Sequence, residues 1–191
     1  MTLEEIAKKM CAKGKGILAA DESTGTIAKR FKSINVENTE KNRLIFRQTL
    51  FSSDAMKKYI GGVILFDETI KQKTTLGSSI PDLISKNNAI TGIKVDKGAK
   101  MLAGSSDETI TEGLDGLRER LTEYYDLGAR FTKWRAVYKI GNKQPSSQSI
   151  KSNAHALARY AALVQEANMV PIVEPEVLMD GSHDINKCYQ V

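Results

Sequence analysis

The chain has 191 residues, of which 41% are hydrophobic and 27% are charged, and its net charge is +5. This composition is typical of a globular protein with a sizeable core, so we expect residues 1–191 to lie in a single domain. No apolar run approaches the roughly 20 residues of a membrane span. The acidic first residues are unlike a secretory or transit peptide, which favours a cytoplasmic protein with no membrane partner.

The basic residues narrow the choice of partner. They do not form runs, and no zinc finger, RNA-recognition signature or basic helix is present. We therefore expect a phosphorylated small molecule and no nucleic acid as the anionic partner, although a solvated basic surface explains the charge equally well. The two cysteines and two histidines lack metal-ligand spacing.

Hydrophobic periodicity and glycine punctuation predict alternating helices and strands. Thr2 and Glu5 form a capping box at the first helix, and Thr39 caps a later one. Residues 22–26 and the polar segment that contains Gly77 and Pro81 are predicted to be loops. The predicted strands are residues 17–21, 63–66, 92–96, 131–140 and 170–177. The predicted helices are residues 2–12, 39–51, 114–127 and 150–168, with a further helix starting at 184.

The strands are short and continuously apolar, and several are separated by helices. This pattern predicts an α/β fold with a parallel sheet covered by helices. The carboxyl ends of parallel strands meet at one edge of the sheet, where such folds place their active sites. Charged residues occur at that end of four predicted strands and are expected to converge there: Asp21, Lys94, Asp96, Lys133, Arg135, Glu174 and Glu176.

This cluster has two interpretations. A buried network of ion pairs is the structural one, but such pairs add little stability because desolvation offsets their attraction. The functional interpretation is a site in which a lysine attacks a carbonyl to form a Schiff base while carboxylates move protons. Spacing alone predicts a Schiff-base aldolase or a sugar-phosphate isomerase, and it nominates Lys133 or Lys94 as the nucleophile.

Four motifs make the chain resemble the class I fructose-bisphosphate aldolases of glycolysis. They are GKGILAADEST at residues 14–24, GIKVDKG at 92–98, KWR at 133–135 and VEPE at 173–176. The resemblance extends from near the N-terminus to Val191 and implies a (β/α)8 TIM barrel. About five of the eight βα units would be present. A related Schiff-base enzyme for another sugar phosphate is the alternative, and the full IKVDKG and VEPE motifs argue against it.

The resemblance implies cleavage of fructose 1,6-bisphosphate to dihydroxyacetone phosphate and glyceraldehyde 3-phosphate. No metal or other cofactor is implied, since an imine serves as the electron sink. By resemblance, Asp21 handles the C4 hydroxyl, Glu174 is the general acid and base, and Glu176 is its neighbour beside the nucleophilic lysine. Lys133 matches an active-site lysine that supports charge.

Further positions match the substrate-binding side of the family's site. They are Lys94, Arg135, Lys29, Arg30, Arg43 and the motif hydroxyl Ser23. Lys29, Arg30 and Arg43 resemble positions associated with a substrate phosphate, and a solvated helix face is the alternative interpretation of all three. For Arg43 a phosphate contact and a solvated helix face are almost equally compatible with the sequence.

The sequence also departs from the family pattern. The family's Schiff-base lysine lies on the sixth strand, which the resemblance places after Val191, so we expect a truncated polypeptide. The family's homo-tetramer is implied only for the complete protein. We expect open sheet edges and an uncovered apolar interior to make this chain poorly soluble or molten, and inactive. An inactive fragment, or a non-catalytic interaction product of an aldolase gene, is therefore the competing function.

Overall fold

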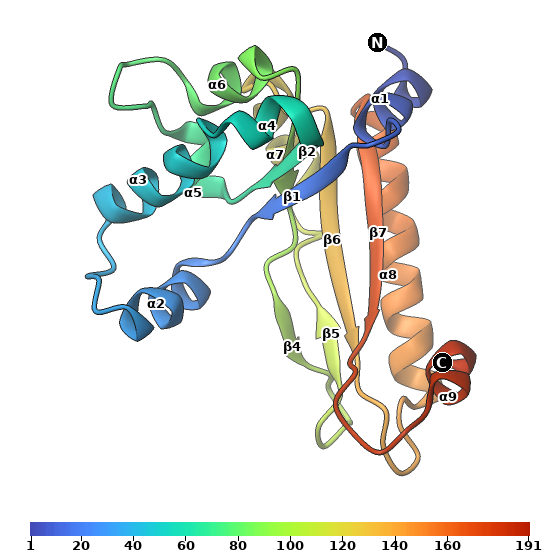
Figure 1. The fold of residues 1–191 in the computed structure, drawn as a ribbon. Helices are drawn as coiled ribbons and strands as arrows, with labels where there is room; N and C mark the ends of the chain where they lie inside the picture. The colour runs from blue at the N-terminus through green and yellow to red at the C-terminus, as the bar shows by residue number, and fades with distance from the viewer.

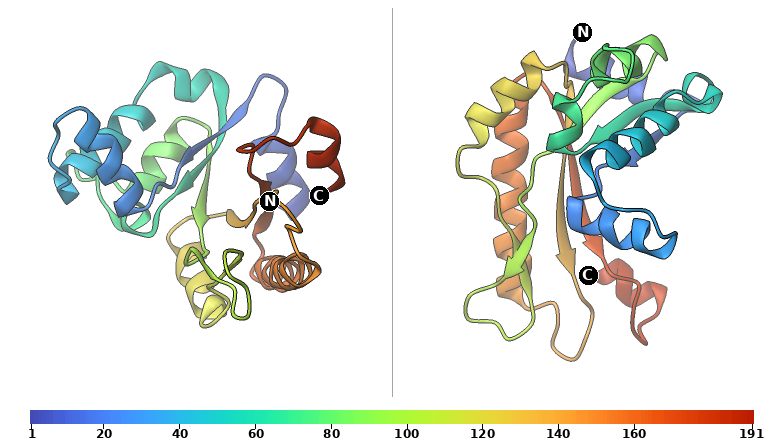
Figure 2. Two further views of the ribbon diagram at one scale, coloured as in Figure 1. Left: turned by 90° about the horizontal axis from the view of Figure 1, so that it is seen from below. Right: turned by 90° about the vertical axis from the view of Figure 1, so that its left-hand side faces the viewer.

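A five-stranded parallel sheet forms the centre of the computed structural model, which describes residues 1–191 (Figure 1). In spatial order its strands are β1 (Gly16–Ala20), β2 (Ile60–Leu65), β3 (Ile90–Lys94), β6 (Phe131–Tyr138) and β7 (Val170–Val177). Every neighbouring pair is parallel. The sheet curls into part of a barrel, as the view from below shows (Figure 2). The predicted parallel α/β fold with about five βα units is confirmed.

Helices connect the strands and cover the outer face of the sheet. The longest, α8, runs beside β6 and β7 (Figure 1). A small antiparallel hairpin follows β3. The helices are α1 (Leu3–Met10), α2 (Thr24–Ser33), α3 (Glu40–Phe51), α4 (Asp54–Tyr59), α5 (Asp67–Lys71), α6 (Ile80–Lys86), α7 (Leu117–Asp126), α8 (Ser147–Glu166) and α9 (Ile185–Gln190). The hairpin strands are β4 (Ala99–Met101) and β5 (Thr109–Thr111). None of the helices is both long and apolar enough to cross a bilayer.

Two predicted loops are shorter than expected, because helices begin inside them. Helix α2 begins inside the hydroxyl-rich segment, because the Ser23 side chain caps it by accepting the backbone N–H of Thr26. Helix α6 contains Pro81 in its first turn, where a missing N–H costs nothing, and Ser79 caps it. In both segments the turn-forming residues belong to helix starts. The capping box of α1 is confirmed.

Apolar side chains pack in two layers, one on each face of the sheet. The outer layer lies between the sheet and the helices, and Trp134 and Tyr160 are at its centre, with ring centroids 5.3 Å apart. The inner layer lies at the amino-terminal end of the curled sheet and consists of Ile6, Met10, Ile64, Ile90 and Phe131. The expectation of an uncovered apolar interior is therefore wrong at this end, because α1 contributes Ile6 and Met10 to cover it.

Phe131 is the largest side chain of the inner layer and is fully buried. Its ring lies against the backbone of β2 and β3 at two glycines. A Cβ atom at Gly62 would lie 3.1 Å from the ring, and one at Gly92 would clash with it. The glycines thus let Phe131 form an apolar floor on the same face of the sheet as Lys133, two residues further along β6.

Candidate active site

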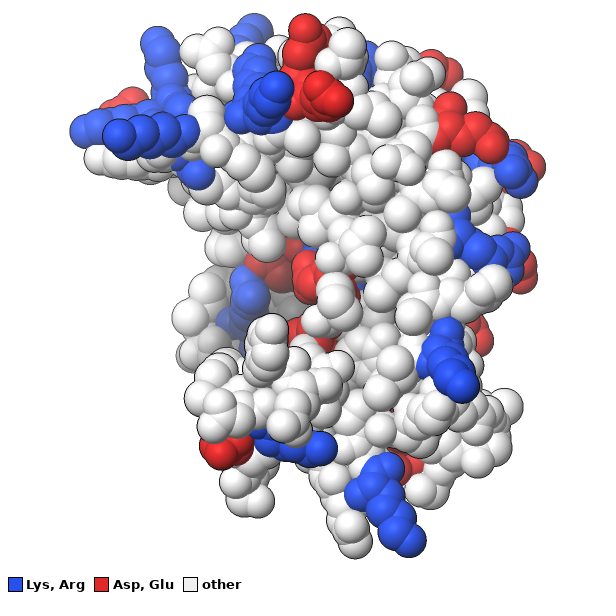
Figure 3. Space-filling model, turned by 90° about the vertical axis from the view of Figure 1, so that its right-hand side faces the viewer, with Lys and Arg blue, Asp and Glu red and all other residues white.

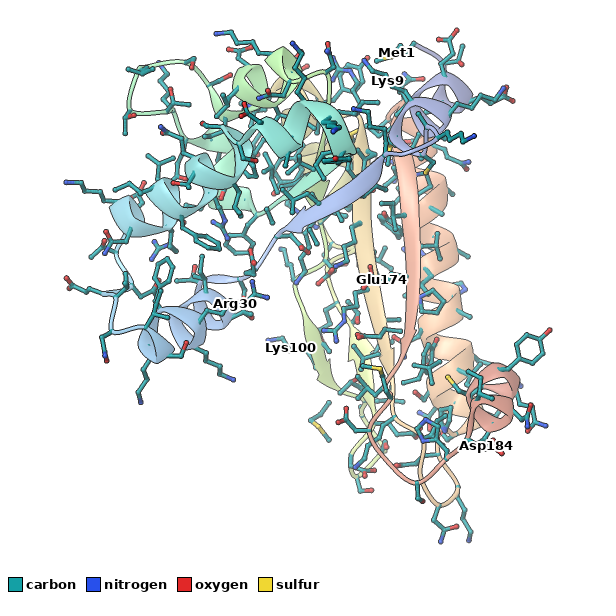
Figure 4. The ribbon with its side chains drawn as sticks, in the orientation of Figure 1. Met1, Lys9, Arg30, Lys100, Glu174 and Asp184 are labelled. Carbon is teal, nitrogen blue, oxygen red and sulfur yellow. The ribbon has the colours of Figure 1, made fainter.

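Charged side chains from four strands gather above this floor, at the carboxyl ends of the strands. Asp21 follows β1, Lys94 ends β3, Lys133 belongs to β6 and Glu174 to β7. The space-filling view shows acidic and basic side chains together in a hollow of the surface (Figure 3). The stick view shows Glu174 beside β7 and Arg30 on the separate α2 (Figure 4). The predicted convergence of the charged strand ends is thus present.

Lys133 is the centre of this cluster. Its Nζ lies 3.2 Å from Asp21 Oδ2 and 3.4 Å from Glu174 Oε2. The side chains of Lys133 and Asp21 are 12% and 11% exposed, whereas that of Glu174 is 34% exposed. One ammonium group therefore bridges two carboxylates from opposite edges of the sheet. Carboxylates held beside an ammonium in a half-buried site are suited to moving protons to and from a bound substrate.

Arg135 extends the cluster along β6. It pairs in register with Glu174, its guanidinium contacts Glu176, and its Nε lies 4.0 Å from Glu174 Oε1. Glu174 and Glu176 therefore share the inner face, as the period of two along a strand predicts. Each carboxylate of the VEPE motif has a cation from β6 opposite it.

Lys94 and Asp96 form a second pair next to the first. The Lys94 Nζ lies 3.4 Å from Asp96 Oδ1. Both line a cavity of about 570 Å³ between the ends of the first three strands and α7. The cavity is also lined by Ser23, Phe66, Asp67, Lys97, Gly98, Arg120 and Tyr124. It is large enough for a sugar phosphate, and its cations and hydroxyls match the groups of such a ligand.

The cavity wall is braced by an ion-pair network between α5 and α7. Tyr124 donates a hydrogen bond to Asp67 Oδ1 at 2.8 Å, and Lys71 lies 2.9 Å from the same oxygen and 3.0 Å from Glu123. Burial and the Asp67 carboxylate raise the pKa of Tyr124 to about 12. Burial alone would raise the pKa of Asp67, but the hydrogen bonds from Lys71 and Tyr124, together with the charges of Lys71 and Arg120, lower it overall. Tyr124 is therefore a protonated donor at neutral pH.

The other predicted substrate-binding residues lie on α2 and α3. Lys29 is exposed and makes no ion pair, and Arg30 contacts Glu22. Arg43 does not join the site. It is 8% exposed, its Nε and Nη2 donate to Glu68 at 2.7 and 2.5 Å, and its Nη1 donates to Asn38. Neither a phosphate contact nor a solvated face describes Arg43, because its donors are used within the protein.

Arg47 is a residue that the sequence reasoning missed. It is fully buried, donates to the backbone carbonyl of Glu22 at 2.6 Å and donates to Thr69 Oγ1 at 2.6 Å. Burial lowers the pKa of Arg47, against the attraction of Glu22 and Glu68. Arg47 thereby fixes the segment directly after Asp21. Its spacing of four residues from Arg43 on helix α3, which places both side chains on one face, was the available signal.

No group of three His, Cys, Asp or Glu side chains in the structure is arranged to hold a metal ion. The functional groups gathered at the strand ends are ammonium, guanidinium, carboxylate and hydroxyl groups. The paired charges can bind an anionic ligand and transfer protons at a carbonyl or hydroxyl group.

Comparisons with known proteins agree on one family. The model of the family described as "Glycolytic: Fructose-bisphosphate aldolase class-I" matches residues 2–191. A probable class 1 fructose-bisphosphate aldolase from Xanthomonas axonopodis pv. citri is 59% identical over 99% of this chain and 57% of its own length. The cytosolic fructose-bisphosphate aldolase 4 of Arabidopsis thaliana is 59% identical over 93% of this chain and 45% of its own length.

A solved structure gives the same result. In the fructose-bisphosphate aldolase of Plasmodium falciparum, in complex with TRAP and a small-molecule inhibitor, the matching chain has a TM-score of 0.95 and 49% identity. The match covers 97% of this chain and 54% of that one. The chain thus spans about half the length of these relatives. Over that span sequence and fold agree, and the chain belongs to the class I fructose-bisphosphate aldolase family.

Proposed function

We propose that this chain supplies the carboxylate and cation side of an aldolase active site. The reaction is the glycolytic aldol cleavage of fructose 1,6-bisphosphate to dihydroxyacetone phosphate and glyceraldehyde 3-phosphate through a Schiff base. The observation that carries the proposal is the position of Lys133 Nζ, 3.2 Å from Asp21 Oδ2 and 3.4 Å from Glu174 Oε2. Family membership supports the reaction class.

Asp21, Glu174, Glu176 and Lys133 are the proposed catalytic residues. Asp21 accepts the proton of the C4 hydroxyl when the C3–C4 bond breaks, and Lys133 supports the charge of that carboxylate across 3.2 Å. Glu174 exchanges protons during imine formation and hydrolysis. Glu176, which contacts Arg135, lies beside the nucleophilic amine. A half-buried site strengthens these interactions because water screens them less.

The substrate phosphates and hydroxyls are proposed to contact Lys94, Arg135, Ser23, Lys29 and Arg30. Lys94 and Ser23 line the cavity, and Lys29 and Arg30 project from α2 with exposed side chains. Ammonium and guanidinium groups bind phosphate through charge-assisted hydrogen bonds. Arg43 is left out of this set, because its guanidinium is engaged by Glu68 and Asn38.

The Schiff-base lysine is proposed to lie outside residues 1–191. Lys133 contacts two carboxylates and Lys94 contacts one, so both side chains are already engaged in ion pairs. Borohydride trapping with dihydroxyacetone phosphate, followed by mass spectrometry, tests this assignment. We expect no adduct on Lys133 or Lys94 of this chain, and an adduct on either would overturn it.

The competing function is an inert or purely interacting product of an aldolase gene. Saturable binding of fructose 1,6-bisphosphate without turnover is the result expected for the proposed half site. Absence of binding would favour the competing function. Turnover of fructose 1,6-bisphosphate by the pure chain would contradict the proposal that the Schiff-base lysine lies outside residues 1–191.

We further propose a cytoplasmic location and a homo-tetramer for the complete protein. Relatives named cytosolic in Arabidopsis thaliana and cytoplasmic in Pisum sativum support the location. The family resemblance is the support for the tetramer. Sedimentation of the complete protein would test the tetramer, since a single species of one or two subunits contradicts it.

A further inference from the structure

Asp96 lies at the point where the backbone pairing between β3 and β6 ends. The last backbone bond between the two strands runs from Val95 N–H to the Lys133 carbonyl, at 3.1 Å. Continuation of a parallel ladder would bring Arg135 N–H to the Val95 carbonyl. Instead, Arg135 N–H donates to Asp96 Oδ2 at 3.3 Å, and the Val95 carbonyl accepts from Arg120 Nη1 at 2.8 Å. The Asp96 carboxylate thus ends the ladder.

The second carboxylate oxygen faces the cavity wall. Asp96 Oδ1 accepts the backbone N–H of Gly98 at 3.0 Å and lies 3.4 Å from Lys94 Nζ. One carboxylate therefore joins the end of β3, the loop that follows it and the backbone of β6. Each of these groups is a donor or a cation, as an ionised carboxylate requires.

The burial of the pair is uneven. The Asp96 side chain is 2% exposed, whereas that of Lys94 is 21% exposed. Lys94 is the only cationic side chain within 4.0 Å of Asp96. A buried carboxylate that loses its single cation carries an uncompensated charge, so the attraction between the two groups is strong. The exposed end of the pair is the ammonium, and it is presented to the 570 Å³ cavity.

We propose that Asp96 is a positioning residue that fixes the Lys94 ammonium at the cavity wall for the phosphate group of the substrate. A lysine has a flexible four-carbon stem, and holding it in one place before binding removes an entropic cost of binding. Naming the ligand as a sugar phosphate rests on the proposed function. The pairing of Asp96 with Lys94 does not.

A double-mutant cycle in the 191-residue chain tests the proposal, with dihydroxyacetone phosphate as the titrated ligand. We expect Asp96→Asn and Lys94→Met each to weaken binding about tenfold, and the double variant to be no weaker than Lys94→Met alone. Glu166→Gln is the control, because it also removes one carboxylate from an ion pair, with Arg118, but Glu166 is exposed and does not line the cavity. It should leave the affinity within about twofold. An equal loss from Asp96→Asn in both backgrounds would overturn the proposal.

A second measurement needs no substrate. Reductive methylation followed by mass spectrometry gives the reactivity of Lys94 relative to Lys97, an exposed lysine of the same cavity. Asp96→Asn should accelerate labelling of Lys94 severalfold and leave Lys97 unchanged, and an unchanged ratio would overturn the proposal. If the chain binds no dihydroxyacetone phosphate, the proposed function fails and this ratio still tests the pairing. Asp96→Glu, which keeps the charge but moves it, replaces Asp96→Asn if the latter does not fold.

Discussion

The inner strands and the edge strands of the sheet have similar apolar sequences and very different environments. In β2 every residue after Ile60 is buried, whereas no residue of β7 is. Val63 in β2 is 0% exposed, and Val173 in β7 is 46% exposed. An inner strand has a neighbour on both sides and helices on its outer face. The same kind of apolar run is therefore a core element in one place and an exposed edge in another.

Two prolines lie on the side of β7 that has no neighbouring strand in this structure. The N–H groups of Val170 and Leu178 bond to residues before and within β6, so the even-numbered residues between them face β6. The odd-numbered residues face the free edge, and two of them are Pro171 and Pro175, which have no N–H. Prolines on an edge strand discourage edge-to-edge association. Association through the edge of β7 is therefore expected to be weaker than through an edge strand that has all its N–H donors.

The largest contrast between inner and edge strands is expected at two glycines. Gly92→Ala in β3 should destabilise the chain by about 3 kcal/mol, because the added Cβ clashes with the buried Phe131 ring. Gly16→Ala in β1 meets no atom within 4 Å and should be stabilising by up to about 1 kcal/mol. Urea unfolding measures the change in the free energy of unfolding for both variants. Equal destabilisation by Gly92→Ala and Gly16→Ala would show that inner and edge strands do not differ in this way.

A matched pair of valines sharpens the same comparison. Val63→Ala removes fully buried carbon and should cost about 2 kcal/mol, from lost transfer energy and the cavity left behind. Val173→Ala removes half-exposed carbon and should cost less than about 1 kcal/mol. The difference in urea midpoint between the two variants is the measurement. A larger loss at Val173 would mean that the edge is covered in solution.

The pairing between α5 and α7 should make the inner region sensitive to alkali. Tyr124 has a pKa of about 12 in the folded chain and about 10 when unfolded, so the folded state holds this proton more tightly. The stability that this proton adds to the folded state is fully present below about pH 10 and is lost as the pH rises toward 12. Tyr124→Phe should abolish this loss, which is on the order of 1–2 kcal/mol. The free energies of unfolding of the unmodified chain and of Tyr124→Phe should therefore approach each other as the pH is raised from 9 to 11. A constant difference between them would contradict the assignment.

The smallest effect on stability is expected at the proline of the free edge. Pro171→Val restores an N–H donor to β7 and should leave the free energy of unfolding within about 0.5 kcal/mol. It should, however, increase self-association as the protein concentration rises. Sedimentation velocity of both proteins measures this. Equal association would show that the edge prolines do not protect β7.

Much of the sheet and of the site could be predicted because the signals are local. The apolar runs identified all five strands, and the period of two placed Lys133 with Arg135 and Glu174 with Glu176 on one face. The resemblance supplied roles for these residues, which remain proposals.

What sequence reasoning missed depends on contacts between distant residues. From the sequence Arg43 is a free cation, but in the folded chain it donates to Glu68, which is 25 residues away. The cover provided by α1 could not be predicted, since Ile6 and Met10 meet Phe131 only in the folded chain. The starts of α2 and α6 were missed for another reason, since serine and proline favour turns and helix starts alike.

The central claim is that the cluster around Lys133 binds the sugar phosphate. Calorimetric titration of the 191-residue chain with fructose 1,6-bisphosphate, beside Lys133→Met, tests it most directly. We predict saturable binding by the unmodified chain and at least about tenfold weaker binding by the variant, a difference of about 1.4 kcal/mol. Circular dichroism establishes that both proteins are folded. Equal affinities of the two folded proteins would contradict the claim.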